Sequence, residues 1–232
     1  MARTLNLTPV ITSIRISETS KLDGIKSWSL QAIDTCPGSV KKGGGLVDAC
    51  LGCYATTGNY NFPNVIAPRL INQEDWKRMA WVDDMVAALI VTHKATSRFF
   101  RWFDSGDMYT IELALKIYDV MVRTPDVQHW LPTRMGKFAK FKQIIAKMML
   151  LPNVMVRFSA DSIDGTYTKG LHGSVITPDA TQIPAGTTLC RAYEHDGKCS
   201  GCRACYSKDV AVIAYPAHGT KMKKVIRIAQ AA

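Results

Sequence analysis

Short apolar runs alternate along the chain with longer segments in which apolar residues recur every three or four positions. The short runs are rich in β-branched and aromatic residues, which is typical of strands. They cover residues 27–32, 98–103, 127–131, 154–158, 174–177 and 210–215. The longer segments predict helices over residues 72–89, 111–122 and 138–148. This order of strands and helices predicts parallel βαβ units with right-handed crossovers.

The apolar positions also predict which side of each helix is buried. In chain order, the three predicted faces consist of Trp76, Met79, Val82, Val86 and Leu89; of Ile111, Ala114, Leu115, Tyr118 and Val122; and of Phe138, Phe141, Ile145 and Met148. Asn72 is a candidate N-cap for the first helix.

Polar residues gather directly after the predicted strands. They are Asp104, Ser105, Asp107, Thr133, Arg134, Ser159, Asp161 and Asp179. In a (βα) barrel the residues after the strands share one rim, and that rim carries the functional site. We therefore expect a binding rim here, with local turn or helix capping as the alternative role at each position.

Seven cysteines fall into two groups. The first is Cys36, Cys50 and Cys53, and the second is Cys190, Cys199, Cys202 and Cys205. A C-x2-C pair can turn both sulfurs to one side of a loop, as a zinc or an iron–sulfur site requires. The two consecutive x2 spacings of the second group favour a cluster, because bacterial ferredoxins use that run. Zinc is the alternative, and His195 and His218 are the histidines near the second group.

Charge and composition narrow the class of protein. The chain of 232 residues is 47% hydrophobic, which excludes wholesale disorder, and its net charge of +10 favours polyanionic partners. Lys221, Lys223, Lys224 and Arg227 are candidates for nucleic-acid phosphate contacts, or form a solvated basic tail. No apolar run reaches the roughly 18 residues of a membrane span, and residues 1–6 lack the apolar stretch of a signal peptide. We expect a cytoplasmic protein with reduced cysteines; the oligomeric state is not indicated.

Several motifs follow one another in a characteristic order. They are Thr35-Cys36-Pro37-Gly38, Cys53-Tyr54-Ala55, Asp104-Ser105-Gly106-Asp107, Pro132-Thr133-Arg134, Arg157-Phe158-Ser159-Ala160-Asp161 and the run of residues 198–205. Over residues 25–218 this order resembles a phage-encoded family known as gene product 88. The resemblance implies organisation rather than a particular chemistry.

The chain is more distantly similar to the radical SAM superfamily, in which three cysteines after the first strand of an incomplete (βα)6 barrel hold a [4Fe–4S] cluster. This resemblance implies an α/β fold: a partial (βα)6-type parallel barrel over residues 1–185, with a cysteine-rich C-terminal segment over residues 186–232. It implies cofactor contacts by Ser105, Gly106 and Asp107, with Asp107 binding the amino group of S-adenosylmethionine. The cysteine spacing is wider here than in that superfamily, and Tyr54 follows the last cysteine of the first group instead of preceding it.

The candidate residues lead to two functional hypotheses. Arg134 is suited to a carboxylate or phosphate, and Ser159 and Asp161 to hydrogen bonds with a ligand. A cluster held by three thiolates leaves one iron open to a small molecule, whereas four thiolates close it. The first hypothesis is an iron–sulfur protein with one or two [4Fe–4S] clusters, acting as a redox protein or a radical-SAM-like oxidoreductase or transferase. The alternative is a non-catalytic cluster or zinc module that binds a host protein or nucleic acid. The residues leave open whether the seven cysteines form one site or two.

Overall fold

The strands between residues 14 and 231 form one eight-stranded sheet in the order β1-β2-β3-β4-β5-β6-β8-β7. The computed structural model describes residues 14–231, so residues 1–6, used above in the signal-peptide argument, lie outside it. The strands are β1 (Ser17–Glu18), β2 (Lys26–Trp28), β3 (Phe99–Trp102), β4 (Gln128–Thr133), β5 (Val154–Ser159), β6 (Gly173–Thr177), β7 (Thr188–Leu189) and β8 (Val212–Pro216). β1 pairs antiparallel with β2, and the other neighbours pair parallel.

The predicted α/β class is confirmed. Strands β2 to β6 and then β8 lie in chain order across the sheet, as successive βαβ crossovers of one hand produce. The short strands β1 and β7 form its edges, and no pairing within residues 14–231 joins these edges to each other. The pairing establishes an open, mostly parallel sheet, and the partial-barrel form remains a prediction. Strands β7 and β8, from the cysteine-rich segment after residue 185, belong to the same sheet.

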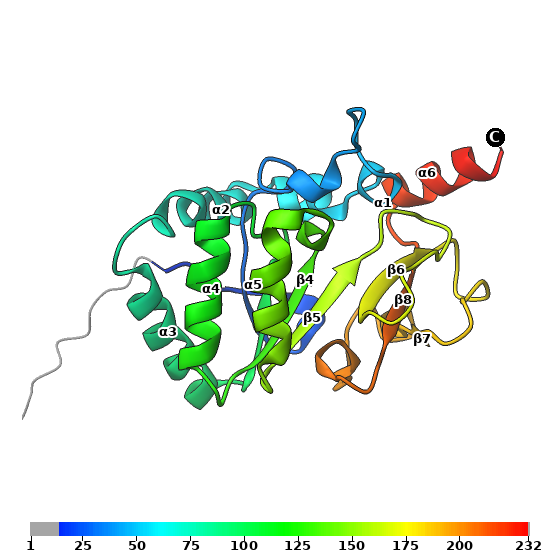
Figure 1. Cartoon of the computed structure of the whole chain (residues 1–232). Coiled ribbons are helices and arrows are strands. Elements are labelled where there is room, and N and C mark those ends of the chain that lie inside the picture. The colour runs from blue at the N-terminus through cyan, green and yellow to red at the C-terminus, as the bar shows by residue number, and fades with distance from the viewer. Residues whose placement is uncertain (1–13, 232) are drawn as a thin grey trace, which may run out of the picture.

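Three of the helices cover one face of this sheet. The helices are α1 (Asp48–Leu51), α2 (Pro63–Asp75), α3 (Trp81–Ala95), α4 (Ile111–Arg123), α5 (Ala139–Leu150) and α6 (Thr220–Gln230). Figure 1 shows α3, α4 and α5 side by side along the sheet, while α6 projects at the far end. In β3, Phe100 and Trp102 pack into the core beneath the helices, whereas Phe99 and Arg101 belong to the opposite face. That opposite face is free for the site described below.

The first predicted helix is in fact two helices. α2 ends at Asp75 and α3 begins at Trp81, so Met79 lies in the connecting turn with 98% of its surface exposed. Asn72 does not cap a helix. It is buried near the end of α2, and its Nδ2 donates to the carbonyl oxygen of Ser29 at 3.0 Å. The apolar residues keep a spacing of three to four positions across this turn, although the turn is not helical. The prediction of one continuous helix was therefore wrong.

The predicted buried face of α4 was correct only in part, since Ala114 is buried and Ile111 and Tyr118 pack against the core. Leu115 and Val122 are 51% and 46% exposed. The side chains buried from this helix are Leu113, Ala114, Ile117, Val120 and Met121. Apolar residues occupy most sides of α4, so their period alone could not select a face. The face of α5 was predicted correctly, since Phe141, Ile145 and Met148 are buried.

The basic C-terminal segment forms α6, which had not been predicted as a helix. Met222 and Ile226 on one side of α6 are buried against Ala49 of α1 and Ile163 of the β5–β6 connection. Within residues 14–231, none of the helices has the length and apolar character that a bilayer span requires.

Candidate functional site

A cavity of about 510 Å³ lies against the face of the sheet opposite α3, α4 and α5, and residues of α1 and α6 form part of its lining. Its walls include Arg101, Trp130 and Tyr215 from the strands, and the loops that follow β2 and β3. We call this cavity the chamber. Six of the seven cysteines line it, namely Cys36, Cys50, Cys53, Cys190, Cys199 and Cys205. The fold therefore brings the two cysteine groups, which are far apart in the sequence, to one place.

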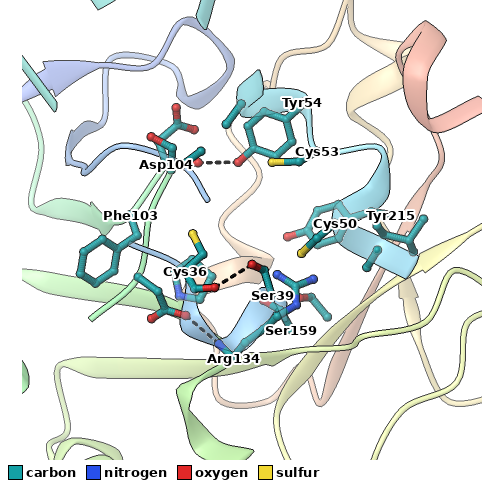
Figure 2. Close-up of a pocket in the computed structure, with 18 of the residues that line it drawn as sticks. Cys36, Ser39, Cys50, Cys53, Tyr54, Phe103, Asp104, Arg134, Ser159 and Tyr215 are labelled. Carbon is teal, nitrogen blue, oxygen red and sulfur yellow. Dashed lines mark hydrogen bonds between the residues drawn. The ribbon is translucent and has the colours of Figure 1, made fainter. Parts of the chain in front are cut away.

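Cys36, Cys50 and Cys53 form what we call the first triad. Figure 2 shows their side chains around a common space, with Tyr54 on one side and Arg134 on the other. Burial and then the nearby Asp107 raise the pKa of the Cys36 thiol to about 12. The charges of Cys53 and Cys50 act in the same direction on this pKa with smaller effect, and all three cysteines line the chamber.

The loop that carries Cys53 is bonded to the end of β3. The Tyr54 hydroxyl donates to the backbone carbonyl of Asp104 at 2.5 Å (Figure 2). The Asp104 carboxylate accepts from the Arg101 guanidinium at 2.9 Å and from the Tyr60 hydroxyl. Asp104 was predicted as a rim residue. Its hydrogen bonds thus attach the loop that carries Cys53 to the end of β3.

Cys190, Cys199 and Cys205 form what we call the second triad. Cys190 directly follows β7, and its backbone amide donates to the carbonyl of Ala214 in β8 at 2.8 Å. The Cys205 sulfur lies 3.1 Å from the Tyr215 hydroxyl. Burial raises the pKa of the Cys199 thiol to about 11, and the charges of Cys205 and Cys190 add to this effect. All three of these cysteines line the chamber.

Cys202 is not part of that group. It is exposed and does not line the chamber. The loop before it binds Asp23, whose carboxylate accepts from the backbone amides of Ser200 at 3.3 Å and Gly201 at 2.9 Å. The sequence grouped Cys202 with three other cysteines, and the structure places it apart from them.

Arg157 supports the second triad from beneath. This residue of β5 is fully buried. Within residues 14–231, every hydrogen bond that its guanidinium donates goes to a backbone carbonyl. The acceptors are Cys205, Gly173, Ala211, Ala204, Ser207 and Val210. Sequence reasoning did not assign Arg157 a role. A charged residue inside an otherwise apolar strand was the signal that could have identified it.

The sequence profile of gene product 88 matches residues 11–229. The chain belongs to the gene product 88 family. This is a family of bacteriophage proteins. No curated protein and no solved structure matches the chain. The more distant similarity to the radical SAM superfamily has no support from these comparisons.

In this gene product 88 protein, Ser105 and Gly106 line the chamber but have structural roles. The Ser105 hydroxyl donates to the carbonyl of Leu30 at 2.7 Å and accepts from Arg69 Nε at 2.6 Å. Gly106 has φ +82°, and a Cβ atom there would lie 2.7 Å from both Leu30 Cβ and Thr35 Oγ1. Only glycine allows this close approach of the loops after β2 and β3.

Asp107 also lines the chamber, and its carboxylate is bonded within the protein. One oxygen accepts from the Thr133 hydroxyl at 2.8 Å and from the Met108 amide at 2.8 Å. The other accepts from the Arg134 amide at 2.9 Å. Burial raises the pKa of Asp107 to about 6, while these donors oppose the rise. Asp107 thus connects the loop after β3 to that after β4.

Arg134, Ser159 and Asp161 all line a second cavity beside α5, and Arg134 and Ser159 also line the chamber. Asp179, the last predicted rim residue, lines neither of these two cavities. Arg134 Nη2 donates to the carbonyl of Ala160 at 2.9 Å. Asp161 does not line the chamber, and in the second cavity its carboxylate lies 2.5 Å from Lys137 Nζ.

The described residues of the gene product 88 chain include no group of three or more His, Cys, Asp or Glu side chains that could hold a metal ion. An iron–sulfur cluster is built from several ions, so its thiolate ligands lie farther apart than those of one ion. The all-sulfur donor sets of both triads and the shared cavity fit such a cluster.

Proposed function

We propose that this gene product 88 protein is an iron–sulfur protein and that its first triad holds a [4Fe–4S] cluster in the chamber. The proposal depends on one observation above all: six cysteines from segments far apart in the chain line a single cavity. Ordinary core filling would scatter thiols among apolar neighbours. In a reducing compartment, such as the host-cell cytoplasm where we place the protein, cysteines gathered in this way favour metal binding over disulfides.

The charges around the chamber suit an anionic group. Arg134 lies beside the first triad, and its charge lowers the pKa of the Cys50 thiol against the larger, opposite effect of burial. Arg157 and Arg101 act in the same direction on Cys205, where burial is again the larger effect. Each triad thus has arginine charge near it that would stabilise thiolates bound to iron.

With three thiolate ligands, a [4Fe–4S] cluster leaves one iron open. When bound, it would supply electron transfer or a Lewis-acidic iron for a small molecule. The chain's own residues would exclude bulk water and position that molecule, since Ser159 and Arg134 line the same space. S-adenosylmethionine remains one molecule to test there. Its amino group would have to share the Asp107 carboxylate with the donors that already bind it.

The test is an anaerobic preparation of the full chain, analysed for iron, acid-labile sulfide and zinc and by visible absorption. We expect iron and sulfide together, and a loss of iron in Cys36→Ser, Cys50→Ser and Cys53→Ser variants that stay folded by circular dichroism. Stoichiometric zinc without sulfide would overturn the proposal. So would wild-type iron content in all three variants.

A second candidate function, nucleic-acid binding, is favoured by one observation. α6 carries four basic residues and no acidic one, and α5 carries three basic residues and no acidic one. Lys223, Lys224 and Arg227 are exposed on α6. Such a basic helix can contact phosphates, with affinity that falls as salt rises.

Fluorescence anisotropy with single- and double-stranded DNA at rising salt tests this candidate. Reversing the charges of Lys223 and Lys224 to glutamate should weaken binding, while Lys94→Glu on α3 is the matched control. Equal affinity of all variants, or no binding at low salt, would exclude this function for α6.

A further inference from the structure

We infer that the second triad, without Cys202, holds a second iron–sulfur cluster and leaves one of its irons open to the same chamber. This rests on the proposed function, because both clusters would share the chamber, but it concerns a separate set of ligands. The cysteine spacing instead favoured one closed site made by all four C-terminal cysteines. The structure favours two three-cysteine sites that line one chamber.

The loop conformation excludes Cys202 from the chamber. Ser200 and Gly201 both adopt left-handed backbone angles, with φ of 47° and 80°. The Cys202 amide donates back to the carbonyl of Cys199 at 2.9 Å, which closes a tight turn. Asp23 binds the amides at the tip of this turn. As a result Cys199 lines the chamber while Cys202 is exposed outside it.

The three remaining cysteines are held by three different parts of the fold. The Cys190 amide bonds to β8, and the Cys199 amide donates to the carbonyl of Lys21 at 2.9 Å. The carbonyl of Cys205 accepts from Arg157 Nε at 3.0 Å. Since each backbone is fixed separately, the triad is in place before any metal binds, which reduces the ordering cost of binding.

Arg157 gives a second, independent reason to place an anionic cluster at the second triad. Its buried guanidinium bonds six carbonyls and, among the described residues, no carboxylate. Burying a cation without a counter-charge is costly. An anionic cluster on Cys205 would supply that charge. The Tyr215 hydroxyl, 3.1 Å from the Cys205 sulfur, is placed to donate to a bound thiolate, as outer-shell groups do at metal sites.

The open iron of this second cluster would take a small anionic donor. Lys21 lines the chamber, and its backbone carbonyl accepts from the Cys199 amide at 2.9 Å. Its Nζ lies 5.7 Å from the centre of the Tyr215 ring. Arg101 also lines the chamber, but its guanidinium is already paired with Asp104. The Lys21 cation favours a carboxylate or another anionic oxygen or sulfur donor over a neutral one.

Iron and sulfide per chain, measured on anaerobically prepared full-length variants, test the ligand set. Cys202→Ser should keep the wild-type content, while Cys190→Ser, Cys199→Ser and Cys205→Ser should each lose roughly half. Equal losses from Cys202→Ser and Cys199→Ser would restore the closed four-cysteine site and overturn our inference. If the second-triad variants lose nothing and the first-triad variants do, the inference fails while the proposed function stands. Wild-type protein without iron would sink the proposed function itself.

Alkylation of the unmutated, metal-loaded protein tests the same point without risk to folding. Iodoacetamide should modify Cys202 alone, as mapped by mass spectrometry, with the six chamber cysteines protected. Protection of Cys202 would contradict the inference.

A separate experiment tests whether the second cluster has an open iron. It uses a variant with Cys36, Cys50 and Cys53 all replaced by serine, which is reduced and examined by electron paramagnetic resonance. Cyanide should shift the remaining signal, and an unchanged signal would show that this cluster is closed.

Discussion

Arg157 Nε donates to the backbone carbonyl of Cys205 across 3.0 Å, which joins the middle of β5 to the loop of the second triad. Five further carbonyls accept from the same guanidinium. Lysine has three donors and cannot satisfy six acceptors. We expect Arg157→Lys to lower the free energy of unfolding by about 3–5 kcal/mol, measured by urea denaturation. Arg98→Lys, at an exposed position, is the control. A loss no larger than that of the control would contradict the structural role of Arg157.

Asp107→Asn separates a structural role from a ligand-binding role. Both carboxylate oxygens accept hydrogen bonds, and an asparagine has one oxygen, so its NH₂ group would face the Arg134 amide or the Thr133 hydroxyl. The expected loss in unfolding free energy is about 1–3 kcal/mol, in the absence of any added ligand. Asp126→Asn at an exposed position should change little. An Asp107→Asn variant as stable as wild type would mean that the carboxylate is free for another partner.

His129 makes the stability depend on pH. Burial lowers its pKa to about 3, and the ring bonds to Trp102 Nε1 at 3.2 Å and Thr124 Oγ1 at 2.9 Å. Below its ordinary pKa of about 6.5, the unfolded chain takes up a proton that the folded chain does not. The contribution of His129 to the free energy of unfolding is therefore fully present above about pH 6.5 and is lost as the pH falls below it. At about pH 5 the loss is roughly 2 kcal/mol.

Urea unfolding between neutral and acidic pH measures this effect. His129→Gln should flatten the dependence, while His195→Gln, at an exposed position, should leave it unchanged. Parallel curves for wild type and His129→Gln would show that other groups control acid stability.

Gly52 allows α6 to approach the first triad. A Cβ atom at this position would lie 2.6 Å from Met222 Cα. Gly52→Ala should therefore displace α6, with a loss of about 1–3 kcal/mol and faster hydrogen exchange of the α6 amides. Gly43→Ala is the matched control, because a Cβ there meets nothing within 4 Å. Unchanged exchange in α6 would show that the contact adjusts without cost.

The sequence predicted strands β2 to β6 and β8, because each includes a short apolar run whose burial is a local property, but it missed the two-residue edge strands β1 and β7. It failed between residues 72 and 89, where Met79 continued the period across a turn. It also included the exposed Leu115 and Val122 in the predicted face of α4, since Leu115 is as apolar as the buried Leu113. Which side of such a helix is buried depends on the packing of neighbouring elements, and the pattern of one segment does not contain that information.

The candidate site was likewise predicted only in part from the sequence. The spacing identified the cysteines that gather at the chamber, but it also included Cys202. The exclusion of Cys202 depends on Asp23, which is distant in sequence and binds the tip of the loop. Asp107 looked like a ligand because it follows a strand. Its engagement by Thr133 depends on how β3 and β4 lie in the sheet.

The contact between Gly52 and Met222 also determines when the chamber is completed during synthesis of the chain. Ribosomes make Met222 long after the first triad has emerged, so one wall of the chamber is missing while most of the chain is already synthesised. The thiols of the first triad stand in an unfinished cavity during that interval. A cluster could be enclosed there only after residue 222 has left the ribosome. Loading would then compete with oxidation of those thiols, and the yield of intact protein would depend on the speed of translation and on the iron supply of the cell.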